Sequence, residues 1–162
     1  GPLARAYYRL KTKTQEQDDT LFGSYKEGFR TNHAHYVKLN GKKILEFPVT
    51  TMPFLKSPFH MSYLIYLASI NPSLMRAYFQ FAIQLCRKSN CGLTFLFHPT
   101  DFLDIQTVPQ LDFFPGMKMP AYEKEKLYHE IVTTILKNFK SAPLYQRAAV
   151  LTSNPETREV TL

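Results

Sequence analysis

The fold predicted from this sequence is decided by the stretch Cys91-Gly-Leu-Thr-Phe-Leu-Phe-His-Pro-Thr-Asp101. A glycine such as Gly92 is typical of the end of a helix. The apolar run Leu93–Phe97, with its aromatic and β-branched residues, predicts a short strand that is covered on both faces. A helix, a tight turn and a buried strand make an αβ unit, so we expect an α/β domain with a parallel sheet or barrel.

The helix that leads into this strand is predicted over 72–89. Asn71 precedes Pro72, and a capping side chain followed by proline at the first helical position predicts a helix start. Ser57-Pro58 repeats the pattern and predicts a second helix over about 58–69. Because the helix over 72–89 is apolar almost all round, we expect it to pack between a sheet and a neighbouring element.

A β-hairpin is predicted still earlier in the chain. Asn40-Gly41 supplies the two positive φ angles of a type I′ turn, between the stretches Tyr36–Leu39 and Ile44–Val49. Pro48 lies near the end of the second strand, where its missing N–H is tolerated, and Thr50-Thr51 follows in a loop. Parallel α/β folds carry their chemistry at the C-terminal ends of strands, so this loop is a candidate part of a site.

After His98 the chain is predicted to form a long loop over 99–119 and then a helix from Pro120. A loop of this length is unusual inside a compact domain unless it shapes a site. A last strand is predicted over 142–146, followed by a frayed polar tail. Two further helical segments are predicted over 3–13 and 15–29.

The sequence has 162 residues, of which 44% are hydrophobic and 20% charged, and these values are typical of one globular domain. The formal net charge is +7, and residues 1–43 hold nine Lys or Arg against four Asp or Glu. Such a basic stretch attracts nucleic acid, anionic lipid or a phosphorylated carrier, or is an ordinary solvated face. Because the cations are scattered and show no recognition-helix pattern, we do not expect nucleic-acid binding.

Two features bear on where the protein works. The longest apolar run, 59–70, is shorter than the roughly 20 residues that a membrane-spanning helix needs. The cysteines Cys86 and Cys91 are expected to be free and buried. We therefore expect a cytoplasmic or membrane-peripheral location, with peripheral contact to an anionic membrane as one option.

His98 is the leading candidate for chemistry. It directly follows the predicted buried strand, and an imidazole suits proton transfer because its ordinary pKa, about 6.5, lies close to neutral pH. Asp101 stands three residues later and could orient the ring or bind substrate. The alternative is a histidine that is merely hydrogen-bonded at a strand end.

His60 is a second candidate, because it lies in the first turn of a predicted helix, where free N–H groups favour an anion. An ordinary surface histidine fits the same position. His33-x-His35 resembles half of a metal site, but no third ligand follows at the required spacing, so we assign no metal ligand in this chain. The sequence contains no glycine-rich phosphate loop, no HExxH and no GxSxG motif.

Four segments together resemble the C-terminal half of bacterial polysaccharide deacetylases of the NodB-homology family. They are Glu46-Phe-Pro-Val-Thr-Thr-Met-Pro53, Pro58-Phe-His-Met-Ser-Tyr63, Phe95-Leu-Phe-His-Pro-Thr-Asp-Phe102 and Phe113-Phe-Pro-Gly-Met117. Within the family the chain is most similar to proteins related to the undecaprenyl-linked aminoarabinose deformylase, and the resemblance covers most of residues 1–140. It implies a partial (β/α) barrel over 1–150, followed by a polar tail over 151–162.

The resemblance also implies an activity, the metal-dependent hydrolysis of an amide on a sugar or lipid-linked sugar. His98 stands in the pattern of the family's final motif, which implies that it protonates the leaving amine. Four residues are expected to line the substrate site, namely Thr50, Thr51, His60 and Asp101.

The early motifs of the family, an Asp-Asp pair after the first strand and an His-x-x-x-His pair, have no counterpart. Asp18-Asp19 lies in a polar stretch with no strand before it. We therefore expect that the metal-binding N-terminal half is missing from this chain, that a divalent metal such as Zn has its ligands elsewhere, and that the chain alone is inactive. A partial barrel exposes strand edges and apolar helix faces, so self-association is expected.

A second hypothesis belongs to another class of protein. The chain could be a non-catalytic module that binds a glycan or an anionic lipid carrier through its basic N-terminal third and its loops. This hypothesis predicts a soluble monomer whose binding does not depend on metal.

Overall fold

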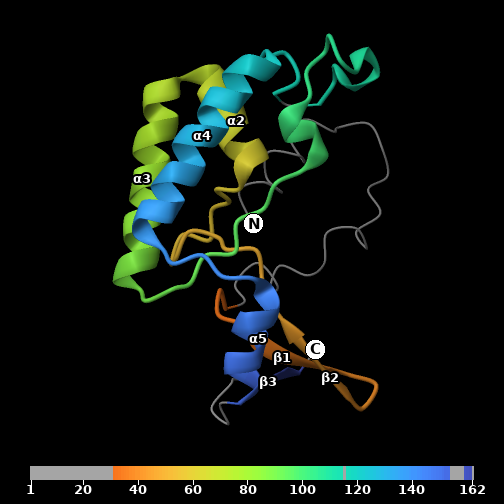
Figure 1. Ribbon diagram of the computed structural model, residues 1–162, viewed down its shortest axis with the longest axis vertical. Coiled ribbons are helices and arrows are strands. Elements are labelled where there is room, and N and C mark those ends of the chain that lie inside the picture. The colour runs from red at the N-terminus through yellow and green to blue at the C-terminus, as the bar shows by residue number, and fades with distance from the viewer. Residues whose placement is uncertain (1–30, 115, 154–158, 162) are drawn as a thin grey trace.

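The computed structural model describes residues 31–114, 116–153 and 159–161 (Figure 1). Three helices, α2, α3 and α4, lie side by side and pack on one another. Figure 1 shows the β-strands and α5 at the other end of the described chain. The helices span Met61–Ile70 (α2), Pro72–Lys88 (α3), Ala121–Asn138 (α4) and Leu144–Thr152 (α5).

The sheet has three strands in the order β2-β1-β3. They span His35–Leu39 (β1), Lys42–Glu46 (β2) and Glu159–Thr161 (β3). β1 and β2 are antiparallel, and φ is +50° at Asn40 and +75° at Gly41 between them, which confirms the predicted type I′ turn. The predicted extension of the second strand to Val49 is wrong, because β2 ends at Glu46, before Pro48. β3 pairs with β1 in parallel, so part of the segment predicted to be a frayed tail is a strand.

The start of α3 confirms the predicted cap. The Asn71 side chain accepts hydrogen bonds from the backbone N–H groups of Ser73 (2.9 Å) and Leu74 (3.0 Å), and Pro72 occupies the first helical position. The helix predicted from Pro120 is also confirmed, because α4 begins at the next residue.

The predicted start of the preceding helix is wrong. α2 begins at Met61, with His60 in the capping position, rather than at Pro58. The Ser57 hydroxyl caps nothing there, since it is hydrogen-bonded to the Tyr78 hydroxyl of α3 at 2.7 Å. The side chain that the local pattern assigned to a helix cap is instead bonded to a residue 21 positions along the sequence.

Two predicted strands are absent from the described structure. Leu93–Phe97 is extended but pairs in no ladder there, and its backbone bonds reach only the loop at Thr50 and the start of α2. The segment 142–146 lies largely in α5, which begins directly after Pro143. The partial (β/α) barrel stays a prediction, because only one small sheet lies within the described residues.

The core lies between the three helices and the extended segment. Fourteen buried residues form one cluster, and both cysteines belong to it as free thiols, as predicted. Those exposed by 1% or less include Phe59, Leu64, Ile65, Ala82 and Ile131. Burial of a Leu, Ile or Phe side chain of this kind stabilises the fold by about 1.5–3 kcal/mol, and it fixes α2 against the loop that carries His98.

The helices predicted over 3–13 and 15–29 lie outside the described residues. Among the described helices, none is both long enough and apolar enough to cross a membrane.

Candidate functional site

The candidate site lies where the start of α2 meets the loop after Phe97. The backbone N–H of Met61 donates to the Leu96 carbonyl at 3.1 Å, which holds the two segments side by side. The short 3₁₀ turn η3, Pro99–Phe102, follows His98 and contacts both α2 and α4. Four polar residues therefore meet at this point, namely His60, Ser62, His98 and Asp101.

Ser62 connects the His98 ring to the Asp101 carboxylate. Its Oγ lies 2.9 Å from His98 Nδ1 and 2.6 Å from Asp101 Oδ1. The second carboxylate oxygen, Oδ2, accepts the backbone N–H of His98 at 2.7 Å, whereas it lies 3.9 Å from Nδ1. Asp101 thus holds the His98 backbone directly and the His98 ring through Ser62.

The exposures of these groups differ in a way that suits proton transfer. The His98 side chain is 44% exposed, whereas that of Asp101 is only 3% exposed. A buried carboxylate keeps a full set of hydrogen bonds and a fixed position, and a half-exposed imidazole is open to another molecule. The accessible group of the cluster is therefore the imidazole.

His60 lies against the His98 ring. The two ring centroids are 5.7 Å apart in an edge-to-face arrangement, and His60 Nδ1 is buried with no hydrogen-bond partner among the described residues. Burial lowers the pKa of His60, the neighbouring His98 lowers it further, and Asp101 acts in the opposite direction. His60 is therefore neutral at neutral pH, and its contact with substrate stays a prediction because its unpartnered Nδ1 is buried.

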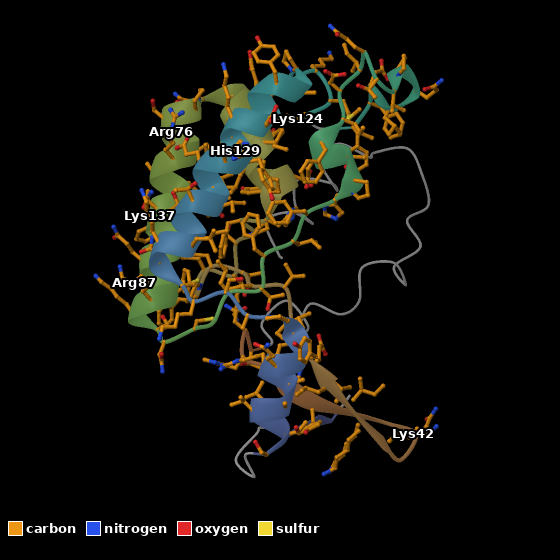
Figure 2. All side chains as sticks on the ribbon, in the orientation of Figure 1. Lys42, Arg76, Arg87, Lys124, His129 and Lys137 are labelled. Atoms are coloured by element: carbon orange, nitrogen blue, oxygen red, sulfur yellow. The ribbon has the colours of Figure 1, made fainter. Side chains whose placement is uncertain are left out.

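Lys124 supports the turn that carries Asp101. Its side chain comes from the first turns of α4 (Figure 2), is 2% exposed, and donates to the carbonyls of Thr100, at 3.3 Å, and Leu103. Burial lowers the pKa of this lysine, and the charges of Asp101 and Asp104 oppose that effect. The ammonium thus ties α4 to η3 and places a cation near both carboxylates.

The two threonines predicted for the substrate site make their hydrogen bonds away from His98. Thr50 Oγ1 accepts the Thr94 backbone N–H at 2.8 Å, and Thr51 Oγ1 donates to the Asn32 side chain at 2.9 Å. Among the described residues, neither threonine hydrogen-bonds to His98 or Asp101. They fasten the loop after the hairpin, and their contact with substrate stays a prediction.

A cavity of about 480 Å³ lies along α4, beside Phe102 of η3. Phe102 ends η3 and lies 5.5 Å, centroid to centroid, from Tyr128 of α4. Tyr122 adds a third ring, and the exposed ion pair Glu125–His129 brings polar groups to the rim. Aromatic walls with a few polar groups are usual in pockets for small ligands, whose volumes run from about 300 to 1,000 Å³.

A resident metal does not fit the described residues. Within residues 31–114, 116–153 and 159–161, no group of three or more His, Cys, Asp or Glu side chains could hold a metal ion. His60 and His98 lie together, but Asp101 is already bound to Ser62 and to the His98 backbone. No chemical step is therefore assigned to a metal here.

The sequence alone indicates His98, His60 and Asp101 as site residues, but it does not indicate Ser62 or Lys124. His98 and Asp101 are three residues apart, so their proximity follows from local structure. Ser62 is 36 residues from His98, and Lys124 is 24 residues from Thr100, so only tertiary packing brings them together. The one local signal was the position of Ser62 two residues after His60 at a helix start.

Comparisons with known proteins leave this site as the main guide to function. No protein-family model matches the chain, and no curated protein or solved structure matches it significantly.

Proposed function

We propose that this chain supplies the proton-transfer side of a carbohydrate N-deacetylase or deformylase, an enzyme that hydrolyses an amide on a sugar or lipid-linked sugar. The observation that carries the proposal is the half-exposed His98 ring, whose Nδ1 is held by Ser62 beside a buried Asp101. An imidazole fixed through one nitrogen presents the other for proton transfer. The resemblance of its surrounding sequence to polysaccharide deacetylases supports the same role.

In this proposal His98 acts as a general acid. As the carbon–nitrogen bond of the amide breaks, Nε2–H of the imidazolium gives its proton to the leaving amine, and neutral His98 remains. The buried carboxylate stabilises the imidazolium before transfer. Neutral His60 packs edge-to-face against the His98 ring and adds no positive charge beside the imidazolium. The residues that activate the attacking water, including ligands of a divalent metal, are proposed to come from outside the described residues.

The test is amide hydrolysis by the full gene product that contains these residues. N-acetyl and N-formyl amino sugars, free and lipid-linked, are incubated with enzyme and Zn²⁺, and the released acid is measured by proton NMR. Replacing His98 with Asn should lower kcat by about 10²- to 10⁴-fold, the usual contribution of a general acid. The matched control is His33→Asn, because His33 is exposed and lies before β1, outside the His98 cluster and outside the aromatic cavity.

Full activity in His98→Asn, or no hydrolysis of any of these substrates, would overturn the proposal. The second result would favour a non-catalytic module that binds a glycan or an anionic lipid carrier. The aromatic cavity formed by Phe102, Tyr122 and Tyr128 is the observation that supports this second function. Glycan binding that persists without metal and is lost on Tyr122→Ala would support it.

A further inference from the structure

The hydrogen bonds around Ser62 determine which nitrogen of His98 carries a proton. A serine hydroxyl has one hydrogen to donate and lone pairs to accept with. The ionised Asp101 carboxylate can only accept, so the 2.6 Å contact uses the Ser62 hydrogen. The 2.9 Å contact with His98 Nδ1 must then be donated by the imidazole. Neutral His98 is thereby held as the Nδ1–H tautomer, with the lone pair on Nε2.

We propose that Ser62 is a positioning residue that fixes the tautomer of His98 by relaying the hydrogen-bond demand of Asp101. This inference deepens the proposed function and rests on it for its biological meaning. Direct contact cannot do the same, because Nδ1 lies 3.9 Å from Asp101 Oδ2, too far for a hydrogen bond. Ser62 fills that gap, and His98 can give up and regain its proton only through Nε2.

Two features keep the relay in one orientation. Asp101 is 3% exposed and its Oδ2 is occupied by the His98 backbone N–H, so the carboxylate is fixed relative to the ring it serves. Ser62 lies in the first turn of α2, whose start is held by the Met61 bond to Leu96. The relay therefore links α2 to the His98 loop by polar contacts as well as by apolar packing.

The inference is tested without substrate by long-range ¹H–¹⁵N NMR of histidine-labelled full chain at a pH where His98 is neutral. Wild type should show His98 as the Nδ1–H tautomer. Ser62→Ala should move it toward the Nε2–H tautomer that free imidazole prefers, and Ser62→Thr, which keeps the hydroxyl, should restore the first pattern. The matched control is Ser69→Ala on the same helix, whose hydroxyl donates to the Tyr66 carbonyl.

If the Ser62→Ala variant does not fold, Asp101→Asn provides an independent test of the His98 tautomer. An amide whose oxygen still accepts the His98 backbone N–H turns its NH₂ group toward Ser62. The hydroxyl must then donate to Nδ1, so His98 should change to the Nε2–H tautomer, the kind of error that disables a Ser-His-Asp triad.

A wild-type Nε2–H tautomer, or a His98 tautomer unchanged in both Ser62→Ala and Asp101→Asn, would overturn the role of Ser62. Neither result depends on whether the gene product hydrolyses amides, so failure of this inference is distinct from failure of the proposed function. Where activity is present, Ser62→Ala should lower kcat and leave KM unchanged.

Discussion

The candidate site depends, residue by residue, on polar side chains that have few possible hydrogen-bond partners. His60 has a buried nitrogen without a partner among the described residues, each oxygen of Asp101 accepts one hydrogen bond, and Ser62 has one hydrogen to donate. A buried polar group without its partner costs about 1–3 kcal/mol, so each of these side chains constrains the others. The consequences can be measured one residue at a time.

His60 makes stability depend on pH in a defined direction. Its pKa is lowered in the folded protein, so below its ordinary value of 6.5 the unfolded chain binds a proton that the folded chain does not. The free energy of unfolding should therefore fall as pH drops through 6.5 and level off below the folded-state pKa. His60→Gln should remove this part of the pH dependence in urea titrations, whereas the exposed His129→Gln should leave it. A His60→Gln profile identical to wild type would contradict this assignment.

Gly116 is a position where only glycine fits. Its φ is +87°, and an added Cβ would lie 2.5 Å from the Cγ2 of Ile65 in α2. Gly116→Ala should lower the free energy of unfolding by about 1–3 kcal/mol because of the clash and the strained backbone. Gly92→Ala is the control, since an added Cβ there meets nothing within 4 Å, and it should change stability by less than about 0.5 kcal/mol. Equal effects of the two substitutions in urea denaturation would argue against this packing.

At the scale of elements, the structure depends on how α2, α3 and α4 are started and tied together. The Asn71 cap starts α3, and Asp104 accepts the first backbone N–H of α4, from Ala121, at 2.8 Å. Lys124 then joins α4 to η3. The bonds of Asp104 and Lys124 hold the loop that follows His98 against α4.

The cap of α3 should be worth a measurable amount. Asn71→Ala removes the acceptor for two backbone N–H groups and should destabilise the protein by about 1 kcal/mol. Asn71→Asp keeps an acceptor and should retain most of the stability. Thermal and urea unfolding of both variants would test this, and equal loss in both would mean that the side chain does not act as a cap.

Lys124 should stabilise η3 through its carbonyl contacts. Lys124→Met leaves the Thr100 and Leu103 carbonyls without this donor and should cost about 1–3 kcal/mol. The neighbouring Lys126→Met, at an exposed position on the same helix, is the matched control. Amide hydrogen exchange should be faster across 99–103 in the first variant alone, and unchanged exchange there would contradict the role.

The elements with strong local signals were predictable, and those set by distant partners were not. The hairpin, α3 and α4 follow from Asn40-Gly41, Asn71-Pro72 and Pro120. Each of these signals determines the local backbone conformation at a turn or a helix start. The segment 142–146 was predicted as a strand. In the structure a helix begins directly after Pro143, just as α4 begins directly after Pro120. A short apolar run does not distinguish helix from strand by periodicity.

In the candidate site, too, only the part set by local sequence was predictable. His98 and Asp101 are near neighbours in sequence, so their association could be inferred from one segment. Their link through Ser62 and the support from Lys124 depend on packing of α2 and α4 against η3, which no local pattern shows. The ring contact of His60 with His98 has the same origin.

At the scale of the whole molecule, the described chain exposes many large apolar side chains. Phe54 is 81% exposed, Phe113 and Tyr145 are each 71% exposed, and Leu144 is 58% exposed. Exposed apolar surface of this kind marks association sites or aggregation. The partial barrel proposed for the fold would produce such surface.

The chain alone should therefore self-associate. Sedimentation velocity over a concentration series should show species larger than a monomer that dissociate on dilution, and Phe113→Asp should weaken the association. Lys126→Asp, on the exposed face of α4, is a control for the added charge. A single monomeric species at all concentrations would contradict the proposed partial fold and favour the binding module.

The proposed role of His98, protonation of the leaving group, is tested by a comparison of two leaving groups. The full gene product and its His98→Asn variant are assayed on an N-acyl amino sugar and on a nitrophenyl ester of the same acid, whose leaving group needs no proton. If His98 is the general acid, the variant should lose about 10²- to 10⁴-fold in kcat on the amide and almost nothing on the ester. Equal losses on both substrates, or no loss on the amide, would contradict it.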